Sequence, residues 1–233
     1  MKETCEQAAK KGDLDRLKRL RDHGYPWDEL TCASAARYGH LEILQWARAQ
    51  VPPCPWNEDT CASAAGNGHL NVLKWARAQD PPCPWHEYTC ASAAGNGHLD
   101  ILQWLRAQVP PCPWNAYTYS WAAYRGHLKV LQWARAQDPP CPWNEYIGAM
   151  AASGGHLDVL RWARAQDPPF PWNEYTCAYA ALGGYLNILI WLREKDCPWD
   201  ELTCKWGTEK GDSEVLRYIV KNKCPGYEKF LDD

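Results

Sequence analysis

Long apolar runs are missing from this 233-residue sequence. No stretch approaches the roughly 20 apolar residues of a membrane-spanning helix. The first six residues, Met1 to Glu6, carry charge where a signal peptide needs an apolar segment. We therefore expect an intracellular, cytoplasmic protein without a membrane segment, and we expect it to be a monomer.

Clusters of basic residues and flexible linkers are missing as well. Lys and Arg are dispersed along the chain and the formal net charge is −3, so nucleic acid is disfavoured as the main partner. No Ser/Gly-rich or charged linker divides the chain, which predicts a single domain over residues 1–233.

What the sequence has instead is a 29-residue repeat. Cys-Pro-Trp recurs at Cys54, Cys83, Cys112 and Cys141, and a Phe-Pro-Trp variant begins at Phe170. Such a period is typical of solenoids, in which each unit leaves an apolar face bare until a neighbour covers it. The sequence predicts an all-α solenoid of eight antiparallel helix pairs. Residues 1–27 form a polar N-terminal cap, 28–199 form six full repeats, and 200–233 form a polar C-terminal cap with a short tail.

Residues 57–85 illustrate how one repeat is expected to fold. Asn57 is a typical N-cap residue, and the segment that follows it predicts a first helix ending at Gly66-Asn67-Gly68. The apolar spacing that follows predicts a second helix from about His69 to Gln79. Asp80-Pro81-Pro82 ends that helix, because proline lacks the amide hydrogen that a helix interior needs.

The segment from Ala64 to Trp75, AAGNGHLNVLKW, resembles the second half of an ankyrin repeat. Ankyrin repeats run to 33 residues and carry TPLH at the first helix, whereas this chain has Thr60-Cys61-Ala62-Ser63 there and a PPCPW segment in place of the hairpin finger. The chain is thus similar to a shortened PPCPW-type variant found in algae and large DNA viruses. The resemblance implies that hairpin fingers are reduced or absent, and that the first helices line a concave groove used for protein partners.

Twelve cysteines raise the question of disulfides or zinc. At repeat junctions two thiols lie seven residues apart in the sequence, as in Cys83 and Cys90. Seven residues after Cys112, however, the chain has Tyr119, and seven residues after Cys141 it has Gly148. A bridge or a zinc site would not tolerate such losses, so we expect structural free thiols, with zinc or disulfides as the alternatives.

Other recurring residues are interpreted as scaffold. The histidines that precede each second helix are expected to bond to turn backbone groups, and the arginines of the second helices are expected to pair with first-helix glutamates. The tryptophans of the PPCPW segments are expected to form a buried row, with ligand binding as the alternative. The tryptophans are Trp56, Trp85, Trp114, Trp143, Trp172 and Trp199.

The repeats differ most at positions three, seven, ten and eleven, counted from the N-cap residue, and these positions share one face of the first helix. The early repeats carry small or polar residues there, whereas the fourth to sixth carry interface-type side chains. The candidate partner-binding residues are Tyr117, Trp121, Tyr124, Arg125, Tyr146, Met150, Tyr175 and Tyr179. The alternative is that Trp121, Met150 and Tyr179 fill gaps between helices, relieved by Gly148 and Gly154.

A non-catalytic protein-binding scaffold is the leading functional hypothesis. Helical-repeat binding of single-stranded nucleic acid and a structural subunit of a larger assembly are the alternatives. No unique grouping of Ser, Cys or His with an acid stands out, so we expect neither an enzyme nor a cofactor or metal site.

Overall fold

The computed structural model describes residues 4–142, 144–211 and 213–230, and within these ranges it contains α-helices, one 3-10 helix and no strand. The first helices of the pairs are α1 (Cys5–Lys11), α3 (Glu29–Arg37), α5 (Glu58–Gly66), α7 (Glu87–Gly95), α9 (Ala116–Tyr124), α11 (Tyr146–Gly154), α13 (Glu174–Gly183) and α15 (Glu201–Lys210). The second helices are α2 (Leu14–Asp22), α4 (Leu41–Arg48), α6 (Leu70–Arg77), α8 (Leu99–Arg106), α10 (Leu128–Arg135), α12 (Leu157–Arg164), α14 (Leu186–Glu194) and α16 (Ser213–Lys221), followed by η1 (Tyr227–Phe230). The predicted all-α architecture of successive helix pairs is confirmed within the described residues.

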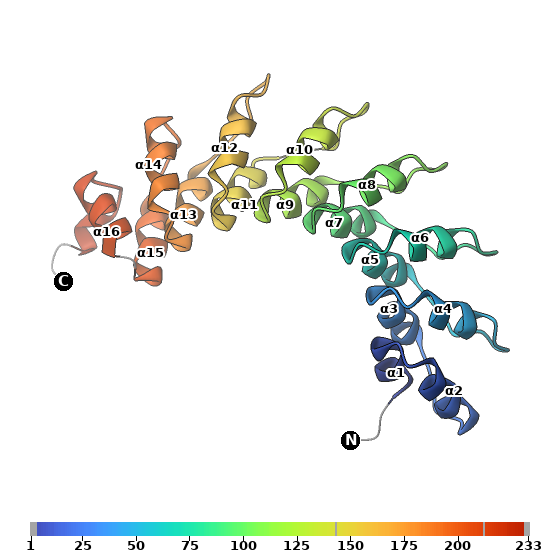
Figure 1. Cartoon of the computed structure of the whole chain (residues 1–233). Coiled ribbons are helices and arrows are strands. Elements are labelled where there is room, and N and C mark those ends of the chain that lie inside the picture. The colour runs from blue at the N-terminus through green and yellow to red at the C-terminus, as the bar shows by residue number, and fades with distance from the viewer. Residues whose placement is uncertain (1–3, 143, 212, 231–233) are drawn as a thin grey trace. The chain divides into compact units, whose positions relative to one another are not determined.

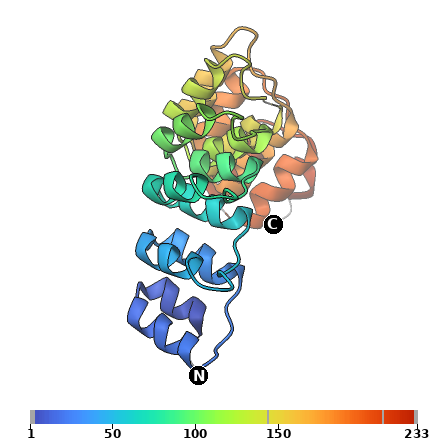
Figure 2. The same cartoon turned by 90° about the vertical axis from the view of Figure 1, so that its right-hand side faces the viewer.

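The chain divides into two compact units, residues 1–118 and 119–233, and the boundary falls within α9. In the first unit α1, α3, α5 and α7 lie side by side in chain order, and each packs against its own second helix (Figure 1, Figure 2). In the second unit α11, α13 and α15 follow the same rule, with α12, α14 and α16 as their partners. The expectation of a single domain stays a prediction.

Helix ends follow the local chemistry of the sequence. The Asn57 side chain accepts a hydrogen bond from the Asp59 amide at the start of α5, as its N-cap position predicts. The second helix of this repeat, however, ends at Arg77 rather than at Gln79. The side-chain nitrogen Nε2 of Gln79 donates to the Trp75 carbonyl oxygen over 2.9 Å. This bond satisfies one of the carbonyl groups at the end of the helix. An extended loop with a cis Asp80–Pro81 bond follows, where an ankyrin finger would stand.

The twelve cysteines are all buried and unbridged, so the expected structural free thiols are what the structure shows. The thiols that approach one another are not those seven residues apart. Cys61 of α5 donates to the Cys83 carbonyl 22 residues along, over 3.8 Å, and the Cys83 thiol donates to the Asn57 carbonyl over 3.4 Å. Each first-helix cysteine thus packs under the return loop of its own repeat, because that loop folds back across the pair.

The contact between the first-helix cysteine and the return loop explains why Gly148 and Tyr119 can replace that cysteine. Gly148 occupies the cysteine position of α11, and a Cβ atom there would lie 2.7 Å from Cε1 of Phe170, which is fully buried in the loop. Tyr119 likewise fills the cysteine position of α9, and its hydroxyl donates to the Leu131 carbonyl over 3.4 Å. In the Gly148–Phe170 pair one partner has become larger and the other smaller, so the core stays filled.

The loop tryptophans are not the buried row that the sequence predicted. The described ones are half-buried, and Trp143 lies outside the described residues. Trp85 lies under the Arg77 guanidinium, whose Cζ is 3.8 Å from the ring centroid, and meets the Trp104 ring of the next repeat edge-on at 6.3 Å. Stacking under arginine places one ring face against a charged group and not against apolar side chains.

The predicted pairing of second-helix arginines with glutamates is also wrong. Arg77 donates to the Cys83 carbonyl oxygen over 2.6 Å, and Arg48 and Arg106 make the same bond to Cys54 and Cys112. The planar guanidinium can donate to a carbonyl and stack on a ring at once. The arginine therefore fixes the return loop of its own repeat.

The histidines do bond to backbone groups, as predicted, and the bond crosses between repeats. His69 donates through Nε2 to the Arg37 carbonyl oxygen over 3.1 Å, and His156 donates to Tyr124 over the same distance. The ring fits because Gly39 lies beneath it with a φ of 74°, where a Cβ atom would be 2.7 Å from the imidazole. Glycine here satisfies both the left-handed turn and the close approach.

The end units expose polar side chains where the inner repeats carry small residues. Glu6, Gln7 and Lys10 of α1 are exposed, while Cys5 and Ala8 of the same helix are buried. At the other end Lys205 and Glu209 of α15 are exposed, while Val215 is buried. Polar outer faces of this kind are what terminal repeats require.

Candidate functional site

The first-helix face, defined by repeat positions three, seven, ten and eleven, lies away from the core that the alanines and cysteines fill. At position three the side chains of Tyr88, Tyr117, Tyr146 and Tyr175 are all exposed. Position three is therefore free to vary without changing the packing below it, and the face as a whole differs between the two units.

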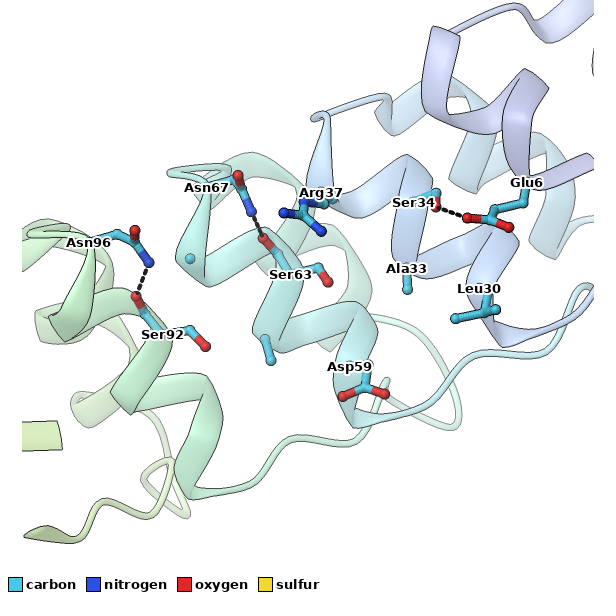
Figure 3. Close-up of a pocket in the computed structure, with 12 residues that line it drawn as sticks. Glu6, Leu30, Ala33, Ser34, Arg37, Asp59, Ser63, Asn67, Ser92 and Asn96 are labelled. Carbon is cyan, nitrogen blue, oxygen red and sulfur yellow. Dashed lines mark hydrogen bonds between the residues drawn. The ribbon is translucent and has the colours of Figure 1, made fainter. Parts of the chain in front are cut away.

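In the first unit this face forms an open groove of about 480 Å³ (Figure 3). The groove is lined by small side chains of α3, α5 and α7 together with Glu6, Arg37 and Asp59. Asn67 and Asn96 turn their amide nitrogens onto the Ser63 and Ser92 carbonyls of their own helices, over 2.9 and 3.0 Å. The lining is thus polar at Asn67 and Asn96, beside the apolar Leu30, Ala33 and Ala62.

Tyr88 and Tyr117 mark the end of the first unit. Their rings stack with centroids 6.0 Å apart and planes inclined by 24°. The hydrogen bond from the Tyr117 amide to Asn115 Oδ1 over 3.0 Å starts α9 and fixes this register.

In the second unit the face begins with Trp121, Tyr124 and Arg125. The Trp121 ring meets the Tyr124 ring edge-on at 6.3 Å, and the Arg125 guanidinium lies 6.0 Å from the Tyr124 centroid. Trp121 is 47% exposed and Tyr124 is 38% exposed. An indole with that much surface in solvent does not act as a plug between helices, so the gap-filling alternative fails for Trp121.

On α11 Tyr146 is exposed and Met150 is half-buried. Gly148, which was expected to relieve crowding from the large residues, instead accommodates Phe170 in the core. Gly154 lies against the Tyr124 carbonyl and the His156 ring, where a Cβ atom would clash. Both glycines therefore serve the packing of α11 and do not make room for Met150.

On α13 and α15 three aromatic rings gather. One of them, Trp206, was missed when the repeats of the sequence were compared with one another. Tyr179 and Trp206 meet at 4.9 Å with planes inclined by 60°, and Tyr175 lies 6.4 Å from Trp206. Trp206 occupies position seven of α15. It was missed because the preceding loop is two residues shorter, and counting from the N-cap residue Asp200 would have found it.

The titratable groups of the repeats are arranged for packing. Burial and a neighbouring thiol raise the pKa of Cys54, Cys83, Cys112 and Cys177, the thiol contact being the larger cause. A raised pKa suppresses the thiolate that a nucleophile or a metal ligand needs. Among the described residues no group of three or more His, Cys, Asp or Glu side chains is placed to hold a metal ion.

Residues 5–48, which span α1 to α4, match a family model described as ankyrin repeats (many copies). Together with the all-helical repeat architecture, this match supports an ankyrin-like repeat protein. A comparison with curated proteins gives no match. Among the described residues no helix is long and apolar enough to cross a membrane.

Proposed function

We propose that the chain is a non-catalytic protein-binding scaffold whose partner docks on the first-helix face of the later repeats. The observation that carries this proposal is the exposed cluster of Trp121, Tyr124 and Arg125. Tyr, Trp and Arg are enriched at interface centres, because they offer large contact area and a polar tip. The ankyrin-like fold supports it further, since ankyrin repeats generally bind proteins.

The wider candidate face includes the tyrosines at position three and the two residues at position seven. Its members besides the cluster are Tyr117, Tyr146, Met150, Tyr175 and Tyr179. Each is at least partly accessible, and none donates or accepts a hydrogen bond through its side chain within the described residues. Their surface is available to a partner without breaking the packing of the repeats.

Single-stranded nucleic acid is the second candidate, and the stacked Tyr88 and Tyr117 rings favour it, because bases stack on such rings. Phosphate contacts require cations, and among the described side chains at the face positions of the second unit Arg125 is the exposed cation. A weak dependence of binding on salt separates a protein partner from a phosphate backbone.

The test is affinity capture from a lysate of the source cells, with the wild-type chain compared with a Trp121→Ala, Tyr124→Ala, Arg125→Ala variant. A Ser63→Ala, Asn67→Ala variant, altered at equivalent positions of α5, is the matched control. We expect a specific protein to be lost with the triple variant and kept with the control, while both variants retain the wild-type helical circular dichroism and melting curve.

Equal capture by all three chains would remove the Trp121 cluster from the docking face. A collapsed melting curve for the triple variant would show that the cluster belongs to the core. Capture of nucleic acid, with a steep loss between 50 and 200 mM salt, would favour the second candidate.

A further inference from the structure

The cluster of Tyr175, Tyr179 and Trp206 differs from the return-loop tryptophans in its partners. Each return-loop tryptophan that the structure describes carries an arginine of the chain itself. Arg48 and Arg77 cover Trp56 and Trp85 at 4.1 and 3.8 Å, and Lys10 lies 5.7 Å from the Tyr38 centroid. Within the described side chains no Lys or Arg lies over the three rings of this cluster.

The geometry of the cluster presents several ring faces around one point. Trp206 is shared, with Tyr179 at 4.9 Å and Tyr175 at 6.4 Å, and the planes are inclined to it by 60° and 46°. Tyr175 is 39% exposed, and the other two rings are half-buried. The negative face of each ring attracts a positive charge within about 6 Å, so inclined rings can act on the same cation.

Charged residues of both signs lie along the chain beside the cluster, including the exposed Lys205 that precedes Trp206. Lys229 pairs with Glu201 and, with a smaller contribution from Lys205, lowers the pKa of that carboxyl group. Two other acids lie near these residues in the sequence, Glu174 before Tyr175 and Glu209 one helical turn after Trp206. Neither of these two forms an ion pair within the described side chains, so their negative charge is available to a ligand.

We infer that the Tyr175–Tyr179–Trp206 cluster receives a lysine or arginine side chain from a basic segment of the protein partner. The inference rests on the proposed docking face and names the chemistry of one of its contacts. The methylenes of the incoming side chain would lie on the rings, while its charge faces Glu174 and Glu209.

The test follows the Trp206 indole N–H signal of the ¹⁵N-labelled full chain, which is assigned by its loss in Trp206→Phe. The probes are three five-residue peptides, Gly-X-Gly-X-Gly, with X as lysine, norleucine or glutamate. Norleucine keeps the methylenes of lysine and removes the charge. We expect the lysine peptide to shift the signal saturably, with the norleucine and glutamate peptides at least about 5-fold weaker, since a cation over accessible rings contributes about 1 kcal/mol.

Tyr175→Leu keeps the Trp206 reporter and removes one ring face. We expect the lysine peptide to bind this variant about 3- to 10-fold more weakly. Tyr88→Leu, at the same repeat position in the first unit, is the matched control and leaves the affinity unchanged. Glu209→Gln lowers the affinity at low salt and has less effect at high salt.

Equal binding of the norleucine peptide would overturn the inference in favour of a purely apolar contact. Stronger binding of the glutamate peptide, or no saturable shift with the lysine peptide up to about 10 mM, would overturn it as well. If partner capture depends on Trp121 while the lysine peptide fails, the inference falls and the proposed function stands. If the peptide binds while capture is independent of Trp121, the Trp121 cluster is not part of the docking face. The Tyr175–Tyr179–Trp206 cluster then remains a binding site.

Discussion

The two units carry the same core and different faces. At position seven the first unit has serine in successive repeats, and the second unit has large side chains. The series is Ser34, Ser63 and Ser92, then Trp121, Met150, Tyr179 and Trp206. Below both faces alanines of the first helices, such as Ala64 and Ala180, and inner leucines of the second helices, such as Leu73 and Leu160, are buried. The comparison teaches that a repeat can change its surface freely where its side chains do not touch the stacking core.

The core itself also differs in one respect. Both units have repeats with two cysteines under the return loop, as in Cys61 with Cys83 and Cys177 with Cys197, whereas one repeat of the second unit has Gly148 under Phe170. A change of the core is tolerated only when a contacting partner changes with it, because interiors are close-packed.

The largest effect is expected for the Gly148–Phe170 pair. Phe170→Cys leaves a cavity and should lower the free energy of unfolding by about 2–4 kcal/mol, and Gly148→Cys overpacks against Phe170 and should cost about 1–3 kcal/mol. The double variant recreates the cysteine pair of the first unit, so its loss should be smaller than the sum of the single losses. Urea unfolding of the four chains measures the coupling, and strict additivity would contradict the pairing.

A second contrast compares a tryptophan of the scaffold with one of the face. Trp85→Leu removes the ring that lies between Arg77 and Trp104, and we expect a loss of about 1–3 kcal/mol. Trp121→Leu, at a 47% exposed site, should change stability by less than about 1 kcal/mol. Thermal melting followed by circular dichroism compares them, and a larger loss for Trp121 would place it in the core.

A smaller and equal effect is expected for the inter-repeat histidines of the two units. His69→Ala and His156→Ala each remove one hydrogen bond to a carbonyl of the preceding repeat. Each should cost about 1 kcal/mol. Chemical denaturation of both variants is the measurement, and a clear difference between them would show that the units use this bond differently.

The smallest change in stability is expected when a large ring is placed on the face of the first unit. Ser63 lines the open groove of about 480 Å³, so Ser63→Trp should alter the free energy of unfolding by no more than about 0.5 kcal/mol. The same urea series measures it, with Ser63→Ala as the control. A loss above about 2 kcal/mol would mean that the groove floor is part of the core.

Much of the local structure could be predicted from the sequence, because caps, glycine turns and prolines act on neighbours in the chain. Asn57, Gly68 and Pro81 determine where the helices of one repeat begin and end, apart from a difference of two residues at Gln79. The histidine bonds were also predictable, since an imidazole beside a glycine turn has a carbonyl within reach.

The errors concern contacts between segments distant in the sequence. Cys61 was compared with the thiol seven residues away, although its partner is Cys83, and Arg77 was assigned to a glutamate although it binds the loop carbonyl and Trp85. Trp206 escaped notice because a shorter loop shifts its register. The partner-binding role of the face residues remains a prediction.

The sequence by itself determined the repeat, the helix pairs and the positions at which repeats differ, since these follow from periodicity and from local backbone chemistry. Only the tertiary structure decided which side chains meet. Return loops fold back over their own helices. Residues 20 or more positions apart in the sequence therefore pack against each other, as Gly148 and Phe170 do. The packing of α13 against α15 brings Tyr175 and Trp206, which lie on different repeats, into one cluster. Such contacts depend on the path of the chain in space, which no local pattern records.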